Sequence, residues 1–266
     1  MDNIFLIFSI CLAIGAIVGF LAGLLGIGGG LIIVPSLIYL LPWAGFDNEQ
    51  LTHVAIATSL ATIILTSLSS ARAHHKQGNI PWPLFKSIVP GIAVGALSSA
   101  FISEQISSDK LQQVFAVFVV LMALQMAFQF KPSKSETMPS LTVMFICSLL
   151  IAMVAGLMGI GGGVLLVPFL SYCGLQMRQA VGFSSATGFL IAFVGTVGYV
   201  LAGLNVDQMP MGTLGYIYIP ALIGIILSSM LVAPFGAKAA TVWPTKVLKR
   251  IFALLLFVVG IKLMWF

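Results

Sequence analysis

The chain of 266 residues is 60% hydrophobic and only 7% charged, against about 45–50% and about 25% in soluble domains. This composition excludes a water-soluble enzyme or binding domain, because no soluble fold could hide so much apolar surface. The net charge of +5 arises without a run of basic residues, so it bears on orientation in a membrane and does not indicate a nucleic-acid partner.

Long apolar runs follow one another along the chain, and most have the length of a membrane-spanning helix. They cover residues 3–24, 31–42, 53–71, 84–103, 111–130, 141–158, 163–176, 180–203, 213–234 and 248–265. A helix needs about 20 apolar residues to cross a hydrocarbon core of about 30 Å. We therefore predict an all-α polytopic membrane protein, in which the runs at 31–42 and 163–176 are too short to span comfortably.

The two short runs reveal an internal repeat, because each follows the same glycine cluster. GLLGIGGGLIIVP runs from Gly23 to Pro35, and GLMGIGGGVLLVP runs from Gly156 to Pro168. Three further blocks match in the same order: AIATSLAT (55–62) with AVGFSSAT (180–187), PGIAVGALSS (90–99) with PALIGIILSS (220–229), and LQQVFA (111–116) with LKRIFA (248–253). Such repeats are typical of secondary transporters. We predict a first repeat at 1–130, a polar linker at 131–140 and a second repeat at 141–266.

The distribution of Lys and Arg favours halves of opposite orientation, since short cytoplasmic loops carry the excess of positive charge. With four crossings per half, the two sides would hold 4 and 6 positive residues. If instead each short run folds back at its glycine cluster, one side holds 9 and the other 1, the first comprising the loops at 71–82, 131–140, 177–179 and 235–250. We therefore predict two inverted repeats, each with a Gly-broken helical hairpin plus three transmembrane helices. The linker would be cytoplasmic and both termini outside. The count leaves open whether the hairpins are re-entrant or fully spanning.

The glycine clusters are the first candidate for a binding site. Irregular backbone at membrane depth is tolerated only where protein buries it or where it lines a wet cavity. A helix that starts after such a break points its free N–H groups and the positive end of its dipole at whatever fills the break, which favours an anion. The alternative for these glycines is close helix packing. The candidate residues are Gly26, Gly28, Gly29 and Gly30, with Gly159, Gly161, Gly162 and Gly163.

Hydroxyl side chains at the start of the following helix are the second candidate. A hydroxyl can donate to an oxyanion without carrying charge, which suits a ligand that must leave again. The alternative is a hydrogen bond to the preceding turn of the same helix. The residues are Thr58, Ser59 and Thr62 in the first half, and Ser184, Ser185 and Thr187 in the second.

A basic cluster closes the run at 53–71. Arg72, His74 and His75 are predicted to lie on the cytoplasmic side, where they would admit an anion at the mouth. The alternative is an interfacial cluster that only follows the positive-inside rule. No Asp or Glu lies in the middle of an apolar run, which argues against a carboxylate proton relay. An inside-negative potential would suffice to drive a negative charge outward, and the alternative is proton symport through the substrate itself or through a histidine.

Nothing in the sequence indicates an enzyme. HExxH, GxSxG and paired carboxylates are all missing from the sequence, and these are the residues that hydrolytic sites use. We predict no catalytic residue, no metal site and no cofactor.

The paired GxxGIGGGxxxVP element resembles the hallmark of the sulfite exporter TauE/SafE family, also called the TSUP transporters, and the similarity covers essentially the whole chain. The resemblance implies transport of a sulfur-containing anion such as sulfite, sulfoacetate, sulfolactate or thiosulfate across the bacterial cytoplasmic membrane. The partners it implies are a small anionic substrate and the lipid bilayer, with a homodimer left open. The alternatives are a carrier or channel for another small anion or a neutral solute, or an accessory membrane protein that transports nothing.

Overall fold

The computed structural model describes residues 2–25, 29–128, 139–206, 209–242 and 245–265, and these are almost entirely helical. Six helices in the described ranges are long and apolar enough to cross a membrane. They belong to a multi-pass membrane protein, as the composition predicts.

The described residues of the first half form five α-helices and one 3₁₀ turn. In chain order these are α1 (Asp2–Leu25), α2 (Gly30–Leu40), η1 (Leu41–Ala44), α3 (Asn48–Lys76), α4 (Trp82–Glu104) and α5 (Ser108–Phe128). The second half repeats the pattern with α6 (Leu141–Leu157), α7 (Gly163–Tyr172), α8 (Met177–Gly203), β1 (Thr213–Leu214), β2 (Ile217–Tyr218), α9 (Ile219–Val242) and α10 (Thr245–Met264). The two short runs form the short helices α2 and α7.

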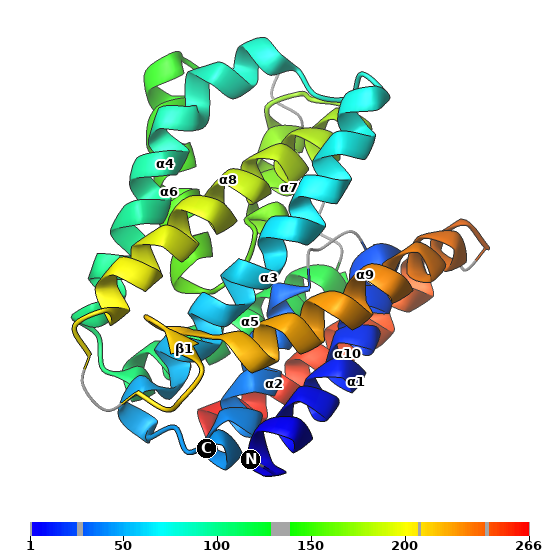
Figure 1. The fold of residues 1–266 in the computed structure, drawn as a ribbon. Coiled ribbons are helices and arrows are strands. Elements are labelled where there is room, and N and C mark those ends of the chain that lie inside the picture. Colours follow the sequence, from blue (N-terminus) through cyan, green and yellow to red (C-terminus); the bar gives the residue numbers. More distant parts are fainter. Residues whose placement is uncertain (1, 26–28, 129–138, 207–208, 243–244, 266) are drawn as a thin grey trace.

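The halves pack against each other in exchanged pairs (Figure 1). Helix α1 lies along α9, and its counterpart α6 lies along α4, the counterpart of α9. Helix α3 packs on its own counterpart α8, and α5 packs on α10. A twofold relation between the halves requires this pattern of exchange, so the packing is compatible with the predicted inverted repeat.

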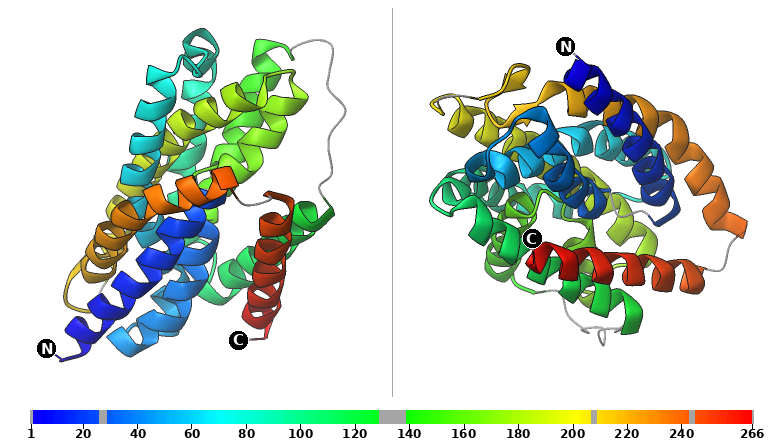
Figure 2. Two further views of the ribbon diagram at one scale, coloured as in Figure 1. Left: turned by 90° about the vertical axis from the view of Figure 1, so that its right-hand side faces the viewer. Right: turned by 90° about the horizontal axis from the view of Figure 1, so that it is seen from below.

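The ends of the molecule are arranged as two inverted halves require. Both chain ends lie at one end of the molecule, and α6 begins at the opposite end (Figures 1 and 2). A Cβ atom added at Gly182, near the start of α8, would lie 3.0 Å from the carbonyl oxygen of Asn79 and 3.1 Å from the Cβ of His74. The loops at 71–82 and 177–179 therefore share one end, whereas four crossings in each half would put them on opposite sides.

Two segments differ from the boundaries that the apolar runs predict. A two-stranded antiparallel hairpin occupies residues 213–218, where the run at 213–234 predicts helix. Gly212 and Gly215 adopt φ values of +91° and +54°, which a helix does not accommodate, so α9 starts only at Ile219. The loop predicted at 235–250 is also wrong, because residues 235–242 continue α9 and residues 245–250 belong to α10.

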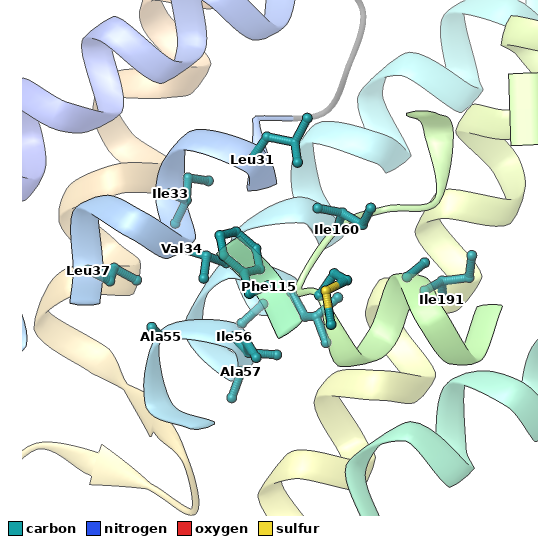
Figure 3. Close-up of a cluster of buried hydrophobic side chains, with 14 of the residues drawn as sticks. Leu31, Ile33, Val34, Leu37, Ala55, Ile56, Ala57, Phe115, Ile160 and Ile191 are labelled. Atoms are coloured by element: carbon teal, nitrogen blue, oxygen red, sulfur yellow. The ribbon is translucent and has the colours of Figure 1, made fainter. Parts of the chain in front are cut away.

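Helix α3 lies at the centre of the protein, and its residues from Leu51 to Ile63 are all buried. Figure 3 shows how the halves meet there, with Leu31 and Val34 of α2, Ile56 of α3 and Ile160 of the second half in one apolar cluster. Within the described ranges the buried polar side chains are Ser, Thr and one His, with no Lys, Arg, Asp or Glu among them. The interior near the glycine clusters is therefore uncharged.

Candidate functional site

Both predicted helix breaks are present. Helix α1 ends at Leu25 before α2 starts at Gly30, and α6 ends at Leu157 before α7 starts at Gly163. Gly29 and Gly162 occupy the equivalent position before each short helix, with φ values of +80° and +71°. This left-handed conformation is one that glycine adopts without strain. Gly26 and Gly28 lie outside the described residues.

The two breaks contact each other across the interface between the halves. A Cβ atom added at Gly30 would lie 2.6 Å from the carbonyl oxygen of Gly159 and 3.1 Å from the Cα of Ile160. Gly159 itself has φ +64°, and a Cβ there would lie 3.1 Å from the Cα of Ile56 on α3. These backbones approach so closely because both positions lack a side chain.

The three predicted hydroxyls of the first half bind protein groups. Ser59 donates to the carbonyl oxygen of Gly159 at 2.7 Å, so it ties α3 to the break of the second half. Thr58 accepts a hydrogen bond of 3.0 Å from the amide of Tyr218 in β2. Thr62 donates to the carbonyl of Ser59 at 2.6 Å, within its own helix.

The hydroxyls of the second half are arranged differently. Ser185 donates to Val181 in its own helix and lies 2.9 Å from the hydroxyl of Ser70 on α3. Thr187 donates to the carbonyl oxygens of Phe183 and Ser184. Ser184 is only 3% exposed, yet its hydroxyl has no hydrogen-bond partner. It alone among the six predicted hydroxyls, all of which lie in the described residues, has no hydrogen-bond partner.

The start of α7 lies beside this hydroxyl. A Cβ atom added at Gly163 would meet only the Oγ of Ser184 within 4 Å, at 3.5 Å. The amide N–H groups of Gly163 and Val164 have no acceptor among the described residues, and both residues are partly exposed. Two peptide donors and one buried hydroxyl donor therefore lie at the start of α7 without a hydrogen-bond partner among the described residues.

Two residues near the breaks were not predicted. The hydroxyl of Ser67 on α3 would lie 3.6 Å from a Cβ added at Gly161, and Tyr199 of α8 donates to the carbonyl of Gly156 at 3.5 Å. Ser67 follows Ser59 by eight residues, about two helical turns, so the two share a face of α3. That spacing could have revealed Ser67, whereas no sequence signal marks Tyr199.

The predicted mouth residues gather at the end of α3. Arg72 and His75 are exposed, and His74 is partly buried. The Nδ1 of His75 accepts from the indole of Trp82 at 3.2 Å, and the Nδ1 of His74 lies 3.2 Å from the side-chain amide of Asn79. His74 thus contacts the turn between α3 and α4, and His75 contacts the first residue of α4.

Other features of the described residues lie away from the breaks. A cavity of about 270 Å³ opens among the ends of α3, α5 and α10, lined by Asn48, Leu51, Asp109, Gln112, Gln113, Leu263 and Met264. Within the described ranges no three His, Cys, Asp or Glu side chains lie close enough together to hold a metal ion.

Comparison with known proteins gives consistent matches. The family model described as "Sulfite exporter TauE/SafE" matches residues 11–263. A "Probable membrane transporter protein" of Haemophilus influenzae is 40% identical over 256 residues, covering 96% of this chain and 97% of that protein. Proteins with the same description are 27% identical in Methanocaldococcus jannaschii, over 86% of this chain and 82% of that one, and 29% identical in Bacillus subtilis (YunE), over 74% and 79%. No solved structure matches.

Proposed function

Because the chain belongs to the sulfite exporter TauE/SafE family, and is therefore a membrane transporter and not an enzyme, we propose that it exports a small sulfur-containing anion. The anion binds at the glycine-broken helices near the middle of the bilayer. The membrane is the bacterial cytoplasmic membrane.

The unpaired donors at the start of α7 are the observation that supports the proposal most directly. The N–H groups of Gly163 and Val164 have no acceptor among the described residues, and the buried hydroxyl of Ser184 has no partner. Each such group costs free energy at membrane depth unless something accepts its hydrogen bond. An anion satisfies all three donors at once and is further stabilised by the positive end of the helix dipole.

The other predicted residues hold this arrangement together. Gly161 and Gly162 let Ile63 and Ile191 approach the break, since a Cβ at either position would lie under 3.0 Å from one of those side chains. Ser59 donates a hydrogen bond to the carbonyl of Gly159. Thr62 donates to the carbonyl of Ser59, and Thr187 donates to the carbonyl of Ser184, so each threonine stabilises the helical turn that carries the serine.

Export needs no separate energy source in this scheme. An inside-negative membrane potential favours outward movement of one negative charge by about 2.3 kcal/mol per 100 mV. In the described part of the chain no carboxylate is buried that could relay protons. Arg72 then supplies the positive charge that concentrates the anion at the cytoplasmic mouth, and His74 and His75 line this mouth beside it.

Flux into proteoliposomes tests the proposal. Purified protein should carry sulfite, thiosulfate or a small organosulfonate across the bilayer, and the same anion should raise its Tm, because a ligand that binds only the folded state stabilises it. Dimethyl sulfone serves as a neutral control of similar shape, tetramethylammonium as a cationic one, and protein-free liposomes report leakage. Transport of the neutral or cationic solute without any sulfur anion would replace this proposal with a carrier of another class, and no transport of any solute would indicate an accessory protein.

A further inference from the structure

The cavity of about 270 Å³ among the ends of α3, α5 and α10 is separate from the proposed transport site. Its lining combines a carboxylate and three carboxamides with three apolar side chains: Asp109; Asn48, Gln112 and Gln113; Leu51, Leu263 and Met264. Among these described residues Asp109 alone is charged. The cavity therefore repels anions, so it does not suit the anion that we propose as substrate.

The cavity lies where α5 and α10 meet at the boundary between lipid and water. Helix α5 has the length and composition of a membrane span, and Asp109 and Gln112 belong to its first two turns. Helix α10 lies along α5 (Figure 2), and the side-chain amide of Gln112 donates to the carbonyl of Leu263, near the end of α10, at 3.2 Å. Further from the cavity, a Cβ atom added at Gly260 would lie 2.7 Å from the Cγ2 of Val120. The two helices therefore run antiparallel, and the start of one meets the end of the other at the cavity.

Two exposed apolar rows lead from the cavity along this helix pair. On α5 the row starts four residues after Gln113, and on α10 it starts three residues before Met264, so each row shares a helix face with a residue of the lining. Because the helices are antiparallel and both right-handed, the two rows lie on the same side of their contact. The row residues, each between 37% and 54% exposed, are Val117 and Leu121 on α5, and Ile261 and Phe257 on α10. Two acyl chains can lie along these rows while a polar head group occupies the cavity.

The polar lining selects among head groups by charge. Asp109 is exposed, and its carboxylate makes no ion pair with any residue that the structure describes. A primary ammonium group donates hydrogen bonds to a carboxylate and to carboxamide oxygens, and the amide groups of Asn48 and Gln113 can donate to a phosphate. Neither Lys110 nor Lys262 lines the cavity. A choline head group has no N–H to donate, and an anionic glycerol head group is repelled by Asp109.

We propose that the cavity and the two apolar rows form a binding site for a phospholipid with a primary ammonium head group, phosphatidylethanolamine. The ammonium group binds Asp109, the phosphate accepts from the carboxamides, and the acyl chains lie along α5 and α10. Helices α3 and α5 belong to the first half of the chain and α10 to the second, so the lipid joins the two halves. This inference does not depend on which solute the protein transports.

Binding of defined lipids to the purified, delipidated full-length protein in detergent tests the proposal. Phosphatidylethanolamine should raise the Tm. In native mass spectrometry it should bind about fivefold more tightly than phosphatidylcholine or phosphatidylglycerol with the same acyl chains, which is the gain expected from one partly exposed ion pair. Equal binding of the three lipids, or no bound lipid at all, would overturn the proposal. Free phosphoethanolamine carries the head group without the chains and should bind much more weakly than the lipid, whereas equally tight binding would make the cavity a site for a soluble ligand.

A matched set of variants tests the location. Asp109→Asn keeps the shape of the side chain and should reduce the preference for phosphatidylethanolamine over phosphatidylcholine to within about twofold. Asp109→Glu retains the charge and should retain most of the preference. Glu49→Gln removes an acidic charge from the first turn of α3, outside the cavity lining, and should bind like wild type. An undiminished preference in Asp109→Asn, or an equal loss in Glu49→Gln, would show that this cavity does not bind the head group.

Discussion

Ser59 donates a hydrogen bond of 2.7 Å to the carbonyl oxygen of Gly159, which lies one hundred residues further along the chain. Both groups are buried, so the bond joins α3 of the first half to the helix break of the second without competition from water. It is one of the few polar links between two halves that otherwise meet through apolar side chains.

We expect Ser59→Ala to lower the free energy of unfolding by about 1–3 kcal/mol, since it leaves a buried carbonyl without its donor. Thermal unfolding in a fixed detergent measures the change, and Ser184→Ala is the matched control because its hydroxyl has no partner to lose. If Ser59→Ala is no less stable than Ser184→Ala, the bond contributes nothing to the junction of the halves.

Gly30 and Gly163 form a second matched pair. An alanine at Gly30 would press its Cβ against the carbonyl of Gly159, at 2.6 Å, whereas at Gly163 the nearest atom is the Ser184 hydroxyl at 3.5 Å. Gly30→Ala should therefore destabilise the protein by about 1–3 kcal/mol through overpacking. Gly163→Ala should keep the wild-type Tm but lower anion affinity, because its methyl group enters the proposed site. A Gly30→Ala variant as stable as wild type would contradict the predicted overpacking. A Gly163→Ala variant with full anion affinity would contradict a binding site at the start of α7.

The sequence predicts the helix breaks well, because consecutive glycines followed by a short apolar run leave few alternatives. It cannot predict the different roles of Thr58 and Ser184, since these depend on which neighbouring helix each side chain meets. Thr58 faces the hairpin at 213–218, and that hairpin is itself hidden within an apolar run. The sequence also cannot predict that Ser59 has a hydrogen-bond partner and Ser184 has none, because the repeat places both serines at equivalent positions.

Thr58 should act in folding and not in binding. Thr58→Val keeps the shape of the side chain but removes the acceptor for the amide of Tyr218, leaving a buried N–H unsatisfied at a cost of about 1–3 kcal/mol. Thr58→Ser retains the hydroxyl and should stay within about 1 kcal/mol of wild type. Calorimetry or thermal unfolding compares the three proteins. A loss of anion affinity in Thr58→Val at an unchanged Tm would instead place Thr58 in the binding site.

The predicted orientation can be tested with single cysteines. Introduced cysteines at Arg72 and Arg178 should react with a membrane-impermeant thiol reagent only from the cytoplasmic side, and one at Lys110 only from the outside. The contact of Gly182 with Asn79 and His74 already requires that the loops at 71–82 and 177–179 share one end. The native Cys11, Cys147 and Cys173 must first be replaced by serine or alanine. Labelling of the cysteines at 72 and 178 from opposite sides would rule out the inverted arrangement.

Arg72 gives the sharpest test of the cytoplasmic mouth. Its side chain is exposed at the end of α3, so its charge should act by attracting the anion and not by holding it. Arg72→Ala should slow flux at low ionic strength by up to about tenfold, with the difference shrinking as salt screens the charge, while equilibrium affinity for the anion and the Tm stay unchanged. Lys86→Ala removes a positive charge from a different helix, α4, and controls for net charge. Equal flux for Arg72→Ala and wild type at low salt would mean that the cluster serves only to orient the helix in the membrane.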